Sequence, residues 1–182
     1  MGLHVCPWWL SFVVDNYIRR VLQNPKKILG NYIKEGQTVV DIGCGPGFFT
    51  IPIARMVGDK GRVIAADVQE RMLDKVHYRA EKTGLLSRIK LHQCGEKAIG
   101  IDAKADFVLA MYMVHEVPDK EAFLKEIAGM LKEDGIFFVS EPMVHVKDSD
   151  FKQMVETAEE AGLKPVSELK LTMSRTALFK ML

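Results

Sequence analysis

The sequence lacks the features that mark secreted, membrane-spanning and nucleic-acid-binding proteins. It holds three cysteines in 182 residues, with no CxxC pair, which is too few for a disulfide framework or a zinc site. Basic and acidic side chains number 25 and 24, so no net field draws in nucleic acid or an anionic membrane. No apolar run reaches the roughly 18 residues of a spanning helix. We therefore expect a cytoplasmic protein with no nucleic-acid partner and no stable membrane insertion.

The composition is that of a folded protein, with 48% hydrophobic residues. The length suits one domain with a sizeable core, and no repeat, linker or low-complexity tract divides the chain. We expect a single domain over residues 1–182. Within it, we expect residues 1–35 to form an N-terminal helical lid and residues 36–182 to form a cofactor-binding sandwich.

Short β-branched runs alternate with helical patterns from about residue 37. Strands are expected at residues 38–42, 62–67, 89–93, 106–111 and 135–140. Helices are expected at residues 48–57, 70–83 and 120–131, and a further one runs from a cap at Asp148 or Ser149 to residue 161. Residues 163–169 and 174–181 read as two strands joined by a short turn. This order predicts an α/β, doubly wound, mostly parallel sheet with helices on both faces and one antiparallel strand at its end.

The most informative segment joins the first strand to its helix and reads Asp41-Ile-Gly-Cys-Gly-Pro-Gly47. We call residues 43–47 of this segment the glycine loop. The glycines allow a tight turn and a close approach to a ligand, and the helix start offers free N–H groups. Phe48 stands where the dinucleotide pattern GxGxxG has glycine, and no lysine follows as in a P-loop. Asp41 would repel a diphosphate and attract an ammonium group. The segment therefore favours a ligand with a positive amine and no phosphate, such as S-adenosylmethionine.

Asp67 closes the second expected strand. In a doubly wound sheet its carboxylate lies next to the first loop, where it can accept hydrogen bonds from both hydroxyls of a ribose. The alternative is an ordinary helix cap or a solvated loop residue.

Together these features resemble class I S-adenosylmethionine-dependent methyltransferases, and most closely the ubiquinone/menaquinone-biosynthesis-like group that acts on small molecules. The resemblance covers about residues 25–182. Besides the glycine loop and Asp67, it rests on residues 107–111, 114–119 and 131–136. It implies a seven-stranded sheet with a reversed last strand. It also implies transfer of a methyl group from S-adenosylmethionine to a small-molecule acceptor, leaving S-adenosylhomocysteine.

The resemblance further implies which residues touch the cofactor. Residues 43–47 would wrap its methionine end, with Cys44 as a small filler, and Met111 would lie beside it. Gly95 stands where the family has an adenine-binding Asp, so Glu96 or the backbone of Cys94 and Gly95 would take that contact. The expected cofactor-binding residues are Tyr17, Asp41, Gly43, Cys44, Gly45, Gly47, Asp67, Val68, Cys94, Gly95, Glu96 and Met111. No metal is expected.

Methyl transfer is an in-line displacement, and a general base is needed only when the nucleophile must lose a proton. His115 is the candidate base, because it follows the fourth expected strand at the ligand-binding edge. Glu116 would orient His115 or the acceptor. The alternative for His115 is plain packing at a helix start. His145 is a second candidate, with a solvated loop as its alternative.

Adjacent Trp8 and Trp9 precede an apolar stretch near the N-terminus. They would form a lid over the acceptor pocket, with Tyr17 reaching the cofactor carboxylate, or else pack plainly or touch a membrane interface. Two other functions stay open, a non-catalytic cofactor-binding subunit and an RNA or protein methyltransferase. The latter would favour a basic face or an Asn/Asp-Pro-Pro-aromatic sequence after the fourth strand, where residues 111–114 read Met-Tyr-Met-Val.

Overall fold

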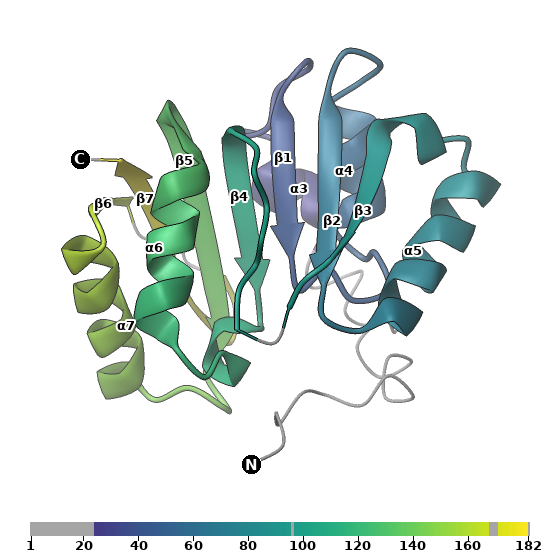
Figure 1. The fold of residues 1–182 in the computed structure, drawn as a ribbon. Coiled ribbons are helices and arrows are strands. Elements are labelled where there is room, and N and C mark those ends of the chain that lie inside the picture. The colour runs from purple at the N-terminus through teal and green to yellow at the C-terminus, as the bar shows by residue number, and fades with distance from the viewer. Residues whose placement is uncertain (1–23, 96, 168–170, 182) are drawn as a thin grey trace.

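The computed structural model describes residues 24–95, 97–167 and 171–181. Within these residues the centre is a seven-stranded sheet in the order β3-β2-β1-β4-β5-β7-β6 (Figure 1). Its strands are β1 (Thr38–Ile42), β2 (Arg62–Asp67), β3 (Ile89–Gln93), β4 (Ala105–Met111), β5 (Leu131–Pro142), β6 (Leu163–Ser167) and β7 (Ser174–Met181). Strands β1 to β5 pair in parallel, whereas β7 runs antiparallel to β5 and β6. The predicted sheet with a reversed last strand is confirmed.

Helices cover both faces of the sheet (Figure 1). They are α3 (Pro25–Leu29), α4 (Thr50–Met56), α5 (Glu70–Lys82), α6 (Lys120–Met130) and α7 (Asp148–Glu160), with short 3-10 turns η2 (Leu86–Arg88) and η3 (Val114–Glu116). The side chains of α3, α4 and α5 join one hydrophobic cluster and those of α6 and α7 join a second. Among the described residues, none of these helices is long and apolar enough to cross a bilayer.

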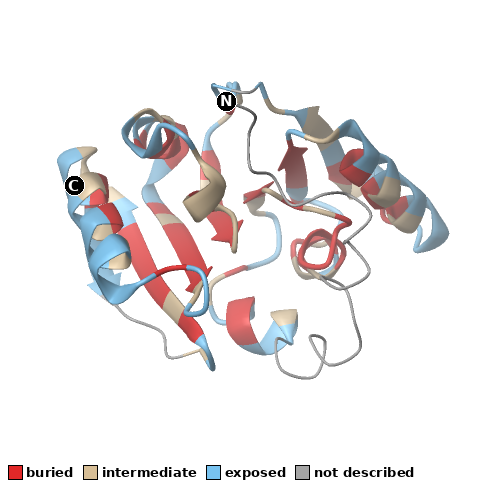
Figure 2. Cartoon of the chain, turned by 90° about the horizontal axis from the view of Figure 1, so that it is seen from below, coloured by how far each residue is buried: buried red, intermediate tan, exposed pale blue. Residues whose placement is uncertain are grey.

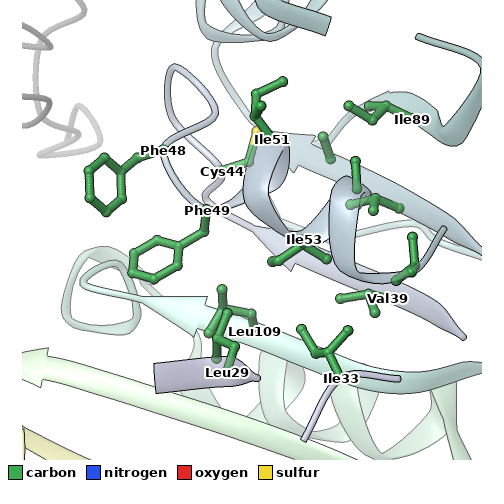
Figure 3. Close-up of a cluster of buried hydrophobic side chains, with 14 of the residues drawn as sticks. Leu29, Ile33, Val39, Cys44, Phe48, Phe49, Ile51, Ile53, Ile89 and Leu109 are labelled. Carbon is green, nitrogen blue, oxygen red and sulfur yellow. The ribbon is translucent and has the colours of Figure 1, made fainter. Parts of the chain in front are cut away.

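The central strands are mostly apolar because successive residues enter opposite clusters. In β1, Val39 belongs to the cluster on the α4 face and Val40 to the cluster on the α6 face. Figure 2 shows burial concentrated in the strands and on the inner sides of the helices. Figure 3 shows the first cluster, in which Leu29 and Ile53 from α3 and α4 pack with Leu109 of β4.

Several element boundaries differ from the sequence expectation. Helix α4 starts at Thr50 rather than at residue 48, because the turn that follows the glycine loop extends that far. Helix α7 is preceded by Lys147, so the expected cap at Asp148 or Ser149 was wrong. Strand β5 is longer than expected, since Leu131 pairs with β4 and its last residues pair with β7. This longer strand carries an extra carboxylate, Glu141, to the end of the sheet.

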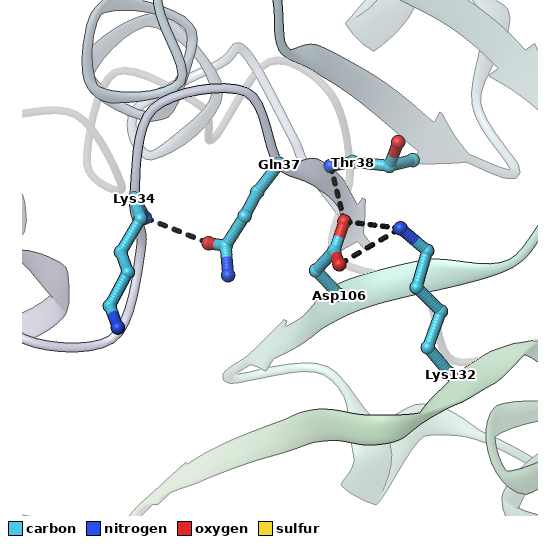
Figure 4. Close-up of polar contacts among 5 residues, drawn as sticks. All are labelled: Lys34, Gln37, Thr38, Asp106 and Lys132. Atoms are coloured by element: carbon cyan, nitrogen blue, oxygen red, sulfur yellow. Dashed lines mark hydrogen bonds and ion pairs between the residues drawn. The ribbon is translucent and has the colours of Figure 1, made fainter.

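A polar contact ties three strands together at the end where β1 begins (Figure 4). The carboxylate of Asp106 accepts the N–H of Thr38 at 2.8 Å and the ammonium of Lys132 at 2.8 Å. The loop before β1 is braced in turn, because Gln37 Oε1 accepts the N–H of Lys34 at 2.7 Å. The glycine loop lies at the opposite end of β1, so this contact stabilises the sheet away from the site.

Part of the predicted N-terminal lid can be placed. Helix α3 lies on the α4 face, where Ile28 and Leu29 are buried. Trp8, Trp9 and Tyr17 lie outside the described residues. The lid therefore stays a prediction.

Candidate functional site

The glycine loop and Asp67 meet at the carboxyl ends of two neighbouring strands. Strands β1 and β2 pair in parallel, so the loop after β1 and the last residue of β2 reach the same edge (the lower edge in Figure 1). One carboxylate oxygen of Asp67 accepts the N–H of Gly45 at 2.9 Å. The other accepts the N–H of Gln69 at 2.9 Å, just ahead of α5. The expected position of Asp67 next to the loop is confirmed, and the same side chain also caps the turn into α5.

Asp67 is a buried charge that keeps capacity to bind more donors. Asp67 is 7% exposed, and this burial raises the pKa of its carboxyl group. The backbone N–H groups of Gln69, Gly45 and Val68 hydrogen-bond to the carboxylate and lower that pKa in part. A carboxylate has about four acceptor positions. The backbone bonds fix its orientation, so hydroxyl donors arriving from the open side of the loop would meet an ordered acceptor.

The glycines of the loop have two different structural roles. Gly43 and Gly45 have φ of +64° and +52°, in the left-handed region that favours glycine. A Cβ at Gly43 would lie 2.7 Å from Cγ of Met113, whereas a Cβ at Gly45 would meet nothing within 4 Å. At Gly47, a Cβ would lie 3.2 Å from Val76 of α5. Gly43 and Gly47 thus allow close packing, and Gly45 borders open space that a ligand can occupy.

Two carboxylates give the loop a negative environment. Asp41 is 2% exposed and accepts the hydroxyl of Thr50 at 2.6 Å, at the start of α4. The pKa of the Cys44 thiol is raised well above its usual value, mainly by burial and to a smaller extent by the charges of Asp41 and Asp67. Cys44 is therefore a neutral, buried filler, as expected. A site with this charge suits a cationic ligand better than a diphosphate.

The end of β3 supplies the neighbouring wall. The backbone N–H of Cys94 donates to the carbonyl of Asp67 at 3.0 Å. Burial raises the pKa of Cys94 to about 12, so its thiol is neutral as well. Val68 is 37% exposed next to Asp67, and Gly95 follows Cys94 at the same edge. Glu96 lies outside the described residues.

A second group of polar side chains gathers after β4 and β5. Strand β4 pairs with β5 in parallel, and Met111 lies opposite Ser140. Residues 112–116, which follow β4, therefore run beside the end of β5. Glu141 Oε1 accepts the N–H of Val114 at 2.8 Å, and Glu141 Oε2 pairs with Nδ1 of His115. The side chain of Glu141 is 2% exposed and that of His115 is 26% exposed.

His145 and Glu116 complete this group. The rings of His115 and His145 stack with centroids 5.8 Å apart and planes 8° apart. Glu116 Oε1 lies 3.9 Å from Nε2 of His115. The bond to Glu141 raises the pKa of His115, against the opposing effect of burial. The structure thus brings together the three residues expected there, His115, Glu116 and His145, and adds Glu141. We call these four residues the histidine group.

The sequence offered a signal for Glu141 that was not used. It directly follows a run of apolar residues in β5, and a charged residue ending such a strand lies at the ligand-binding edge of a doubly wound sheet. The hydroxyls of Tyr112 and Ser174 were also missed, and they hydrogen-bond to each other across the strand ends. Their pairing depends on the terminal hairpin folding back beside β5, which spacing alone does not define.

The same edge exposes apolar side chains. Met143, Val144 and Met173 are 50%, 73% and 65% exposed. The N–H of Met143 donates to the carbonyl of Met173 at 3.1 Å, which links the loop after β5 to the start of β7. An apolar rim therefore borders the histidine group.

Comparison with known proteins decides the family. Residues 33–175 match the family model described as a methyltransferase domain, which is most of the chain. This chain belongs to the methyltransferase domain family. The expected resemblance is confirmed at that level, and the methyltransferase domain includes the glycine loop, Asp67 and the histidine group.

Curated relatives match a little more than half of this chain. It is 32% identical over 110 residues to the ubiquinone/menaquinone biosynthesis C-methyltransferase UbiE of Enterobacter sp. (strain 638), covering 60% of this chain and 44% of that protein. It is 35% identical over 104 residues to the demethylmenaquinone methyltransferase of Lactobacillus johnsonii, covering 57% of this chain and 43% of that protein. The chain thus spans less than half the length of these relatives.

Solved structures share the fold. A SAM-dependent methyltransferase from Aquifex aeolicus superposes with a TM-score of 0.86 at 24% identity, over 98% of this chain and all of that one. The methyltransferase domain therefore shares its overall fold with this solved structure.

Proposed function

We propose that this methyltransferase domain transfers a methyl group from S-adenosylmethionine to a small-molecule acceptor and releases S-adenosylhomocysteine. The observation that carries the proposal is the glycine loop held against the carboxylate of Asp67 by the 2.9 Å bond to Gly45. The buried carboxylates of Asp41 and Asp67 favour a cationic ligand, and the open side of Gly45 leaves space for it. Both fit a sulfonium cofactor with an α-amino group.

The residues around the loop take distinct parts in this proposal. Asp67 accepts the two ribose hydroxyls, as an oriented carboxylate does in charge-assisted bonds. Residues 43–47 surround the methionine portion, and the charge of Asp41 attracts its ammonium group. Val68 and the backbone of Cys94 and Gly95 border the adenine. When bound, S-adenosylmethionine supplies a methyl carbon activated by a positively charged sulfur.

His115 acts on the acceptor. It lies after β4 at the same sheet edge, and its Nε2 is the ring nitrogen not paired with Glu141. It takes the proton of the acceptor at Nε2, so that the acceptor attacks the methyl carbon in line. Met111, at the end of β4, is a wall between the cofactor and this group.

The relatives and the surface both support a quinone-like acceptor. One relative is named as a ubiquinone/menaquinone biosynthesis C-methyltransferase and another as a demethylmenaquinone methyltransferase. These names support a reduced quinone methylated at carbon as the acceptor. The exposed Met143, Val144 and Met173 offer an apolar rim for such a ring. The formal net charge of +1 gives less support to a nucleic-acid substrate. The sparse cysteines support a cytoplasmic location.

The test is a labelled-methyl assay. The full chain is incubated with methyl-labelled S-adenosylmethionine and 1,4-naphthoquinol, and separately with a small-metabolite extract. We expect label in an acceptor product, and loss of that label in the Asp67→Ala variant. Cofactor bound with no labelled product from either source would favour a non-catalytic subunit, and label in added RNA or protein alone would contradict the small-molecule acceptor.

A further inference from the structure

Glu141 is a buried carboxylate whose two oxygens are both committed to one short turn. Oε1 accepts the N–H of Val114 at 2.8 Å and Oε2 pairs with Nδ1 of His115. Its side chain is 2% exposed. Removing a carboxylate from water is unfavourable unless hydrogen-bond partners compensate for the lost hydration. Both partners lie in η3, so the carboxylate of Glu141 acts on the conformation of His115.

We propose that Glu141 is a positioning residue that holds His115 with its Nδ1 proton toward the protein, leaving Nε2 to take the proton of a hydroxyl or acidic C–H acceptor. This inference rests on the proposed function, since it names how the acceptor loses its proton. A nucleophile that carries no proton would not need such a base. The pair of Glu141 and His115, the dyad, therefore favours an acceptor that must lose a proton, such as a quinol or a phenol.

The step balances in charge and atoms. The acceptor gives its proton to Nε2, and the electron pair of that bond stays on the acceptor, which becomes an anion. A pair of that anion forms the new bond to the methyl carbon. Where a quinol is methylated at a ring carbon, that carbon afterwards releases its own proton and the quinol oxygen regains one. The bond between methyl carbon and sulfur breaks with its pair left on sulfur, which becomes a neutral thioether. The positive charge lost at sulfur thus appears on the His115 ring. Glu141 stabilises that charge, and the partly exposed ring returns the proton to solvent.

The other charged and titratable groups around His115 fit this arrangement. Glu116 from the same turn lies 3.9 Å from Nε2, and its charge adds to the effect of Glu141. Lys120 at the start of α6 opposes both. His145, from the loop after β5, covers one face of the ring at 5.8 Å between centroids. Glu141 and His145 together fix the plane of the ring, so Nε2 has a defined direction.

The first measurement uses the wild-type chain without cofactor. Nitrogen-15 NMR of the imidazoles reports which ring nitrogen holds the proton in the neutral state. We expect the Nδ1–H tautomer for His115, assigned through a His115→Gln variant. The Nε2–H tautomer would overturn the proposal, whatever the variants do.

The second measurement compares Glu141→Gln with Glu133→Gln, a control on the same strand at an exposed position. In Glu141→Gln the pKa of His115 should fall, because its largest raising contribution is lost. With 1,4-naphthoquinol, kcat should fall by about 10- to 100-fold, and the acidic limb of its pH profile should move to lower pH. Glu133→Gln should change neither, and Glu141→Asp should restore part of kcat.

The outcomes separate this inference from the proposed function. S-adenosylhomocysteine binding, measured by calorimetry, should be equal in wild type and Glu141→Gln. An unshifted pKa of His115, or an unshifted pH limb, overturns the role of Glu141 even when methyl transfer proceeds. Failure to bind S-adenosylhomocysteine in the wild type overturns the proposed function instead, while the tautomer measurement still decides the dyad.

Discussion

Alanine at Gly45 and at Gly43 should affect binding and folding differently. Both glycines have positive φ, and an alanine in that region costs about 1–2 kcal/mol. At Gly45 no steric contact adds to this, because the Cβ meets nothing within 4 Å. At Gly43 the Cβ would lie 2.7 and 2.9 Å from two carbons of Met113, and such overpacking adds about 1–3 kcal/mol.

Although Gly45→Ala should lose less stability than Gly43→Ala, it should directly weaken ligand binding. The N–H of residue 45 is retained in alanine, so its bond to Asp67 at 2.9 Å can persist. The new methyl group would occupy the space we assign to the cofactor. We therefore expect Gly45→Ala to lower the affinity for S-adenosylhomocysteine by at least about 10-fold, or about 1.4 kcal/mol. Gly45→Ala should nevertheless remain more stable than Gly43→Ala.

Urea unfolding followed by far-UV circular dichroism gives the two stabilities, and calorimetry gives the affinities. Wild-type affinity in Gly45→Ala would refute the position of the cofactor. Equal loss of stability in both variants would refute the packing argument for Gly43.

Three further substitutions test other parts of the account. Asp67→Ala should leave a folded sheet and weaken the binding free energy of S-adenosylhomocysteine by about 2–3 kcal/mol, as expected for charge-assisted hydrogen bonds. An unchanged affinity in calorimetry would mean that the ribose binds elsewhere. Asp106→Ala leaves the N–H of Thr38 and the ammonium of Lys132 without their acceptor, so the free energy of unfolding in urea should fall by about 1–2 kcal/mol, with ligand affinity unchanged. The raised pKa of His115 means that its ionic contribution to stability is present below its unfolded pKa of about 6.5 and is lost as pH rises through the higher folded value. Wild type should therefore exceed His115→Ala in stability by more at pH 6 than at pH 9, and the opposite trend in urea titrations would contradict the assignment.

Local sequence chemistry was sufficient for most of the sheet. Strands β1, β2, β3 and β7 begin and end at the expected residues. In β1 and β2 the prediction works because apolar residues are buried on both faces of the strand. The loop and Asp67 followed from the same logic, since parallel strands bring their carboxyl ends to one edge. The outer features were less predictable. The length of β5 depends on its partners at both ends, and the start of α4 depends on how far the turn after the loop extends.

The histidine group shows why part of the site was missed. His115 and Glu116 were found because they follow β4 directly. Glu141 is 26 residues away from His115 in the chain, and their contact depends on the register between β4 and β5, including the shift between Ala105 and Phe107. Apolar periodicity does not encode that shift. The stacking of His145 on His115 depends in addition on the loop after β5 turning back across η3.

The central claim is that the glycine loop and Asp67 bind S-adenosylmethionine and not a dinucleotide. Titration calorimetry of the full chain with S-adenosylhomocysteine, and separately with NAD, tests it most directly. We predict that each chain binds one molecule of S-adenosylhomocysteine and that NAD gives no measurable heat of binding. Tighter binding of NAD, or no binding of S-adenosylhomocysteine, would contradict it.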